Sequence, residues 1–138
     1  MSRLQSLYLR SNQLSSSIPP ELAQLSRLKS LVLGFNQVSG TIPPELAQLG
    51  DLQFLALSDN QLSGSIPPEL GQLSNLIRLW VYSNQLSSSI PPELGQLSRL
   101  QFLALNSTSL SPLHYFSIPE LIDLSLNSKY NGFTKITD

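Results

Sequence analysis

Aromatic and arginine side chains recur at a fixed spacing in the middle of the chain. Phe54, Arg78 and Phe102 follow one another at intervals of 24 residues, and Trp80 and Tyr82 come after Arg78 at alternate positions. A guanidinium group can stack on aromatic rings, and these residue types supply many of the strongest contacts at binding interfaces. These five residues are therefore the first candidates for a recognition surface.

Residues suited to catalysis or metal binding are sparse in this sequence. It contains a single histidine, His114, and no cysteine, which excludes disulfides, thiol chemistry and zinc–thiolate sites. Neither a phosphate-cradling glycine loop nor a metal-ligand spacing occurs in it. We therefore predict a protein that is not an enzyme and that needs no metal or cofactor.

A repeat of 24 residues organises most of the chain. Four regular segments align without gaps: residues 1–24, 25–48, 49–72 and 73–96. Each carries an asparagine at the same position, namely Asn12, Asn36, Asn60 and Asn84. Such a period is typical of a solenoid, in which each turn is stable only against its neighbours. We predict one domain over residues 1–138.

The first half of each repeat predicts a short strand. Side chains alternate along a strand, so Leu79 and Val81 are expected to face inward while Arg78, Trp80 and Tyr82 face outward. One strand per turn gives a parallel sheet. The asparagines come where the chain leaves this sheet, and we expect their amides to bond backbone groups of adjacent turns.

The second half of each repeat predicts a short helical turn. Residues 87–96 read SSSIPPELGQ. Paired prolines exclude a regular central strand and favour an extended approach to one helical turn, with proline at its start and glutamate near its positive end. The equivalent glutamates are expected to be solvated side chains on the convex side rather than a cation site: Glu21, Glu45, Glu69 and Glu93.

The complete unit resembles the plant-type leucine-rich repeat, LxxLxxLxLxxNxLSGxIPxxLGxLxx. Residues 49–72, LGDLQFLALSDNQLSGSIPPELGQ, match that pattern at nearly every defined position. The resemblance implies an α/β solenoid: a right-handed coil with a concave parallel sheet of about six strands and a convex side of extended segments, 3-10 turns and short helical turns. It also implies binding of proteins, peptides or carbohydrates on the concave face. Ser16 and Ser88 stand where the family has glycine.

The repeat changes at both ends of the sequence. Residues 97–117 form a degenerate repeat in which Thr108 replaces the asparagine, and residues 118–138 are expected to supply a last strand at about Ile122–Leu126 and a C-terminal cap. Met1 already occupies the first leucine position, so no cap precedes the first turn. This is consistent either with self-association of the protein through its N-terminal end or with an excised or designed array.

Outward positions of successive strands form columns across the concave face. One column places Arg78 between Phe54 and Phe102, and the next places Trp80 between Ala56 and Ala104. Stacking within the array and contact with a ligand are both open interpretations, and they are compatible. The predicted ligand-binding residues are Phe54, Arg78, Trp80, Tyr82 and Phe102, with Tyr8, Phe35 and Asp59 at the periphery.

The preferred hypothesis is a non-catalytic recognition module that binds a protein or peptide on its concave face. One alternative is a structural or designed array that self-associates through its N-terminal end. Another is a surface that binds ice or an ordered polysaccharide. That alternative rests on rows of hydroxyl groups at Ser15, Ser39, Ser63 and Ser87 and, two residues on, at Ser17, Thr41, Ser65 and Ser89.

Charge and hydropathy narrow the range of partners. Eight basic and nine acidic residues give a formal charge of −1, so there is no basic field to hold a nucleic acid. No apolar run reaches the roughly 18 residues that a membrane helix needs, and the N-terminus does not resemble a signal peptide. We expect neither nucleic acid nor membrane as partner. A cytoplasmic location is favoured, and an extracellular one stays open if the chain is a fragment.

Overall fold

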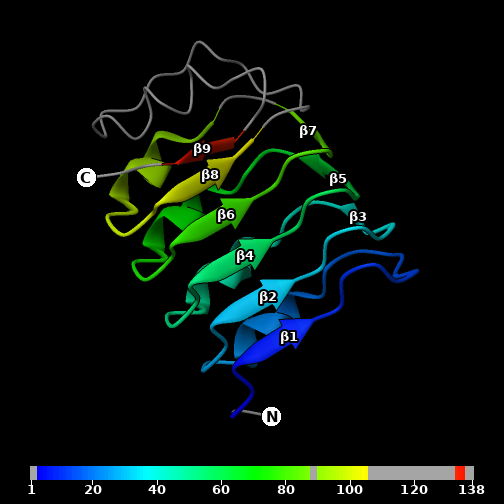
Figure 1. The fold of residues 1–138 in the computed structure, drawn as a ribbon, viewed down its shortest axis with the longest axis horizontal. Coiled ribbons are helices and arrows are strands. Elements are labelled where there is room, and N and C mark those ends of the chain that lie inside the picture. Colours follow the sequence, from blue (N-terminus) through cyan, green and yellow to red (C-terminus); the bar gives the residue numbers. More distant parts are fainter. Residues whose placement is uncertain (1–2, 88–89, 106–132, 136–138) are drawn as a thin grey trace.

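One wall of the molecule is a sheet of short strands stacked in chain order. The computed structural model describes residues 3–87, 90–105 and 133–135. Its parallel strands are β1 (Ser6–Tyr8), β2 (Ser30–Val32), β4 (Phe54–Ala56), β6 (Arg78–Trp80) and β8 (Phe102–Ala104). They lie side by side in chain order (Figure 1), and neighbouring strands pair at residues 24 positions apart, for example Leu55 with Leu79. The repeat period therefore sets the register of the sheet.

The sixth strand of this sheet differs from the expected one. It is β9 (Phe133–Lys135), which pairs antiparallel with β8. The strand predicted at about Ile122–Leu126 lies outside the described residues, and β9 itself was not predicted from the sequence. The last strand of a repeat array presents unpaired N–H and C=O groups. Any extended segment that can reach them satisfies them, whichever way it runs.

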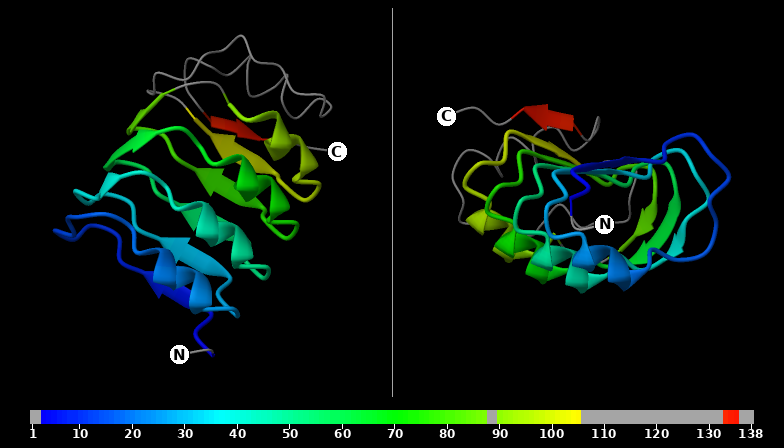
Figure 2. Two further views of the ribbon diagram at one scale, coloured as in Figure 1. Left: turned by 180° about the vertical axis from the view of Figure 1, so that it is seen from behind. Right: turned by 90° about the horizontal axis from the view of Figure 1, so that it is seen from below.

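The opposite side of the coil carries one short 3-10 helix per turn. These helices are η1 (Pro20–Gln24), η2 (Pro44–Gln48), η3 (Pro68–Gln72) and η4 (Pro92–Gln96). Each begins with a proline, preceded by a second proline in extended conformation, and has its glutamate in the first turn. Figure 2 shows the helices and the sheet on opposite sides of a flattened tube. The double proline therefore marks the start of each helix, as predicted.

A second, smaller sheet lies along the segments that lead from the first sheet toward the helices. It consists of β3 (Ser39–Gly40), β5 (Gln61–Gly64) and β7 (Gln85–Leu86), all parallel. Its paired residues are 22 apart, as in Ser39 with Gln61, so equivalent residues are staggered by two positions between turns. This sheet adds a second row of backbone hydrogen bonds between turns. Within the described ranges, no helix is long and apolar enough to cross a lipid bilayer.

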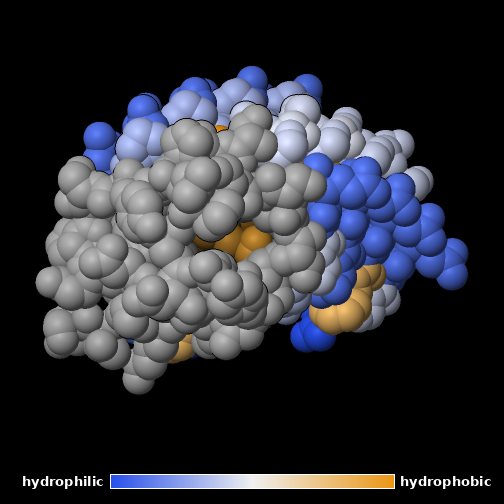
Figure 3. All heavy atoms as spheres, turned by 90° about the horizontal axis from the view of Figure 1, so that it is seen from above, coloured by the Kyte–Doolittle hydropathy of each residue, from blue (hydrophilic) through white to orange (hydrophobic). Residues whose placement is uncertain are grey.

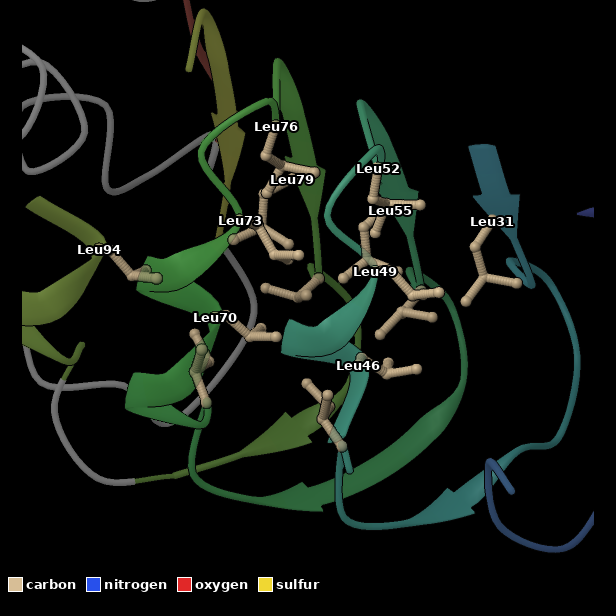
Figure 4. Packing of buried hydrophobic residues seen from close by; sticks show 14 of the residues in the cluster. Leu31, Leu46, Leu49, Leu52, Leu55, Leu70, Leu73, Leu76, Leu79 and Leu94 are labelled. Carbon is tan, nitrogen blue, oxygen red and sulfur yellow. The ribbon is translucent and has the colours of Figure 1, made fainter. Parts of the chain in front are cut away.

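Leucines from every side of the coil fill its interior. In the third turn Leu49, Leu52, Leu55 and Leu57 are fully buried, and Figure 4 shows leucines of adjacent turns stacked in register. The leucines of the first turn are only partly buried: Leu4, Leu7, Leu9, Leu14 and Leu22. Viewed from above, the described part of the surface is mainly hydrophilic, with small hydrophobic areas (Figure 3). The apolar residues thus form one continuous core along the axis.

The asparagines form the predicted ladder between turns. The amide nitrogen of Asn60 donates to the carbonyl oxygens of Leu57 and Ser58 in its own turn and of Leu33 in the turn before. Its side-chain oxygen accepts a bond from the N–H of Val38 at 3.0 Å. Asn36 and Asn84 make the same kinds of contact. Each of these side chains therefore satisfies backbone groups of two turns where the chain leaves the sheet.

Two positions of the repeat use left-handed backbone conformations in the turns where the structure describes them. At the glycine position of the family pattern, Gly40 and Gly64 have φ of 79° and 76°, and Ser16 adopts 71° in their place. Left-handed backbone costs a side-chain-bearing residue more than glycine, so Ser16 is held there by its neighbours. The residues directly before the asparagines form a second left-handed column: Ser11, Phe35, Asp59 and Ser83, with φ between 52° and 57°.

Candidate functional site

A guanidinium group is held between two phenylalanine rings on the outer face of the six-stranded sheet. Arg78 Cζ lies 5.6 Å from the ring centroids of both Phe54 and Phe102, which are its partners on the strands to either side. The stack follows from the sequence, because equivalent positions of β4, β6 and β8 pair directly. The Arg78 side chain remains exposed. Stacking thus restricts the direction of a side chain that stays exposed to solvent.

Trp80 extends this stack along its strand. It pairs in register with Ala56 and Ala104, both buried, and its ring meets the Phe54 ring edge-on at 4.8 Å between centroids and an interplanar angle of 78°. Edge-to-face contact is a favoured arrangement for aromatic rings. Phe54, Arg78, Trp80 and Phe102 therefore form one preorganised cluster, here called the aromatic cluster. Tyr82 follows two residues later and is half-buried.

The predicted peripheral residues Tyr8 and Phe35 lie toward the N-terminal end of the same face. Their side chains are 61% and 46% exposed, and they are the only large hydrophobic side chains among the described residues classed as exposed. Arg10 Cζ lies 4.5 Å from the centroid of the Phe35 ring. Arg10 is not among the predicted site residues. Arg10 belongs to the outward column Arg10, Gly34, Ser58 and Tyr82, whose members are 24 residues apart. This spacing could have identified it from the sequence.

Small buried residues separate these two groups. Val32 and Ala56 are 7% and 3% exposed and lie in the column of Trp80, while Gly34 and Ser58 are buried in the column of Tyr82. A Cβ atom at Gly34 would lie 3.2 Å from the carbonyl oxygen of Ser58, so the two turns approach closely there. Small side chains thus form the middle of this face between the large side chains at its two ends, and these four residues are here called the floor.

Two polar atoms at this floor are buried without hydrogen-bond partners. They are Ser58 Oγ, on a residue that is 3% exposed, and Asp59 Oδ2, on the next residue. Asp59 has φ of 57° and belongs to the left-handed column, and its N–H donates to the carbonyl oxygen of Tyr82 at 3.1 Å. Asp59 is one of the predicted peripheral residues of the ligand-binding site, whereas Ser58 was not predicted from the sequence. Serine occurs at many other positions of the sequence, and only its burial in the structure distinguishes Ser58 from them.

The described residues hold no group of three or more histidine, cysteine or acidic side chains placed to bind a metal ion. His114 lies outside the described residues. Among the described residues, the candidate site consists of aromatic rings, two arginines, one carboxylate and a buried hydroxyl.

Parallel strands stacked in register, an asparagine ladder and one 3-10 helix per turn define a solenoid of repeated turns. The family described as leucine rich repeat matches residues 2–62 and again residues 75–97. The chain belongs to the leucine-rich repeat family. A comparison with curated protein sequences gives no match.

Solved structures of plant proteins share this fold. A chain of the BIR3–SERK2 complex from Arabidopsis thaliana is 37% identical over 94% of this chain and 68% of its own length, with a TM-score of 0.83. The LRR ectodomain of the plant membrane receptor kinase GASSHO1/SCHENGEN3 from Arabidopsis thaliana, solved with CASPARIAN STRIP INTEGRITY FACTOR 2, is 42% identical over 79% of this chain and 13% of its own length, with a TM-score of 0.78.

A plant ice-binding protein is also similar. It is 36% identical over 83% of this chain and 34% of its own length, with a TM-score of 0.67. The chain thus spans only a small part of the GASSHO1 ectodomain and about a third of the ice-binding protein.

Proposed function

We propose that this protein is a non-catalytic recognition module that binds a protein or peptide on the outer face of the six-stranded sheet. The observation that carries the proposal is the aromatic cluster, in which Arg78 is stacked between Phe54 and Phe102 and remains exposed. A binding group that is already ordered loses little conformational freedom on binding. By their descriptions, two similar structures are a plant peptide hormone receptor in complex with RGF2 and the receptor kinase HAESA in complex with the peptide hormone IDA and the co-receptor SERK1, which supports this class of partner.

The energetics of the cluster favour a role as the centre of an interface. Tryptophan and arginine are enriched among residues whose truncation costs about 2 kcal/mol or more of binding free energy. Both lie on a face whose floor is formed by small residues such as Ala56. A partner chain could therefore lie along the floor and contact the aromatic cluster with one or two side chains.

Truncation of side chains of the aromatic cluster is expected to weaken peptide binding strongly without unfolding the protein. Random peptides displayed on phage would be selected against the whole chain, and the affinity of recovered peptides would be measured by isothermal titration calorimetry. Trp80→Ala and Arg78→Ala should each weaken binding by about 30-fold or more, because a loss of about 2 kcal/mol corresponds to that factor.

Glu45→Ala on the convex helix η2 is the matched control, since Glu45 is exposed and lies on the other side of the coil. Circular dichroism should show the same fold for all three variants. Peptides that keep their affinity for Trp80→Ala and Arg78→Ala would show that binding occurs elsewhere and would refute the proposal.

The hydroxyl rows support a second candidate, binding to ice. Ser15, Ser17, Thr41, Ser65 and Ser87 are exposed, Ser39 and Ser63 are half-buried, and Ser89 lies outside the described residues. Neighbouring turns are spaced by about 4.8 Å, which gives a regular, uncharged array of hydroxyl groups, and one similar structure is that of a plant ice-binding protein. This candidate concerns the side of the coil around β3, β5 and β7 rather than the aromatic cluster.

A microscopic assay of ice recrystallisation tests this second candidate. Inhibition by the wild-type chain that is lost in Thr41→Lys and Ser65→Lys, and kept in Gln48→Lys on helix η2, is the expected result if the rows bind ice. A wild-type chain that inhibits no better than an equal amount of an unrelated protein excludes it.

A further inference from the structure

We infer that Ser58 and Asp59 form a subsite for a cationic group of the ligand, the ammonium or guanidinium of a basic peptide. This inference rests on the proposed function and names the chemistry of the partner. It starts from the two buried oxygens without partners, Ser58 Oγ and Asp59 Oδ2, which belong to consecutive residues of one turn.

An unpaired buried oxygen is costly to a folded protein. Leaving a buried polar group unsatisfied costs about 1–3 kcal/mol, and more for a charged group. Most such atoms are paired in native proteins, so two on adjacent residues require an explanation. A ligand that donates hydrogen bonds to both oxygens would remove the penalty on binding.

Neither of the two oxygens accepts a hydrogen bond from the described residues. The backbone N–H of Asp59 bonds the carbonyl oxygen of Tyr82, and its buried carboxylate oxygen has no donor within hydrogen-bond distance. Arg10, a cation of the same face, is stacked on the Phe35 ring. Arg10 belongs to the first turn and Asp59 to the third, two strand spacings of about 4.8 Å away.

The charge of Asp59 selects the class of ligand group. Hydrogen bonds between a carboxylate and a charged donor are roughly twice as strong as neutral ones. Ser58 Oγ can accept a second N–H of the same group. Aromatic residues stand beside both: Phe35 precedes Asp59 in the left-handed column, and Tyr82 follows Ser58 along the sheet. Rings next to a bound cation add cation–π attraction.

Access to the subsite requires a small movement. Both oxygens are shielded from solvent in the free chain, so a ligand group must displace a covering side chain. Tyr82 is next to Ser58 in the same column and is only half-buried. Tyr82 is the candidate for this movement, because it is the large side chain at the equivalent position of the next turn.

Peptides selected against the whole chain on phage provide the test. Those that depend on Trp80 should carry a required basic group. Replacing their lysine by norleucine or their arginine by citrulline should weaken binding about tenfold. Peptides whose N-terminus is acetylated are measured as well, because a loss of affinity on acetylation identifies the terminal amine, rather than a side chain, as the donor. Asp59→Asn and Ser58→Ala should weaken binding of the same peptides, and only Asp59→Asn should reduce the dependence of affinity on salt.

Asp51→Asn is the matched control, because Asp51 is an exposed carboxylate of the same repeat outside the strands. Ser58→Ala also has a readout in the free chain: it should raise the midpoint of thermal unfolding, since it removes an unsatisfied hydroxyl. Peptides that need Trp80 but keep full affinity without a basic group or with Asp59→Asn would overturn the subsite and leave the recognition function standing. If no selected peptide depends on Trp80, both proposals fail.

Discussion

Replacing Asn84 by alanine is expected to destabilise the protein by about 3 kcal/mol or more. The Asn84 side chain is buried, donates to the carbonyl oxygens of Leu57, Val81 and Tyr82, and accepts from the N–H of Leu62 at 2.9 Å. Each buried group left unsatisfied costs about 1–3 kcal/mol, and alanine removes partners on two turns at once. Urea denaturation followed by circular dichroism measures the change.

Asn12→Ala is the matched control for the ladder. Asn12 occupies the same position in the first turn, but it is exposed and its amide bonds only carbonyl oxygens of its own turn, those of Leu9 and Arg10. Water can replace these bonds, so we expect a loss of about 1 kcal/mol or less. Equal losses for both variants would show that the contacts between turns contribute nothing beyond the local ones.

Fluorescence adds local information to the same experiment. Trp80 is the single tryptophan of the chain and lies in the turn that Asn84 closes. A repeat array can lose part of its turns before the rest. In the Asn84→Ala variant we therefore expect the fluorescence midpoint to fall below the midpoint measured by circular dichroism.

Gly71→Ala is the second substitution with a large expected effect, a destabilisation of about 3 kcal/mol. A Cβ atom on Gly71, in helix η3, would overlap the carbonyl oxygen of Glu93 in helix η4 and would lie 2.8 Å from its carbonyl carbon. Overpacking of this kind costs about 1–3 kcal/mol. We expect the upper end, because the obstacle is backbone and cannot rotate away. Thermal unfolding followed by circular dichroism measures it.

Gly50→Ala is the control, since a Cβ at Gly50 would have no neighbour within 4 Å. Its effect should stay within about 0.5 kcal/mol, as for most surface substitutions. Alanine occupies the position equivalent to Gly71 in the first two turns, as Ala23 and Ala47, so a turn can hold a Cβ there when the next helix lies far enough away, whereas η3 and η4 lie too close for one. A Gly71→Ala variant as stable as wild type would show that η3 and η4 can separate without cost.

The repeat period was sufficient to predict most of the fold. Because equivalent residues recur every 24 positions and pair directly, the sequence predicted the strands, the position of Arg78 between Phe54 and Phe102, and the proximity of Trp80 to Ala56 and Ala104. Stacking of Arg78 on the two rings was one of two open interpretations, and the structure shows it. The asparagine ladder was predicted because an inward amide at a turn has few other partners. These features follow from the 24-residue period and from the alternation of side chains along a strand, and the structure confirms them.

Other features depend on contacts that a period does not determine. The second sheet pairs residues 22 apart, although the period is 24, because equivalence between turns does not decide which residues face each other. The antiparallel β9 results from an open sheet edge, which accepts either strand direction. The burial of Ser58 and its missing partner depend on the side chains around it, so its serine could not be distinguished from the others in the sequence.

The left-handed column directly before the asparagines makes this array easy to diversify. Its turns are held by backbone bonds, such as Phe35 N–H to the carbonyl oxygen of Ser58, and by the asparagines beside them, rather than by the side chains of the column. Four turns already carry two serines, a phenylalanine and an aspartate there. Substitutions at this position can therefore change the exposed side chain of one turn at a time without changing the fold of the coil.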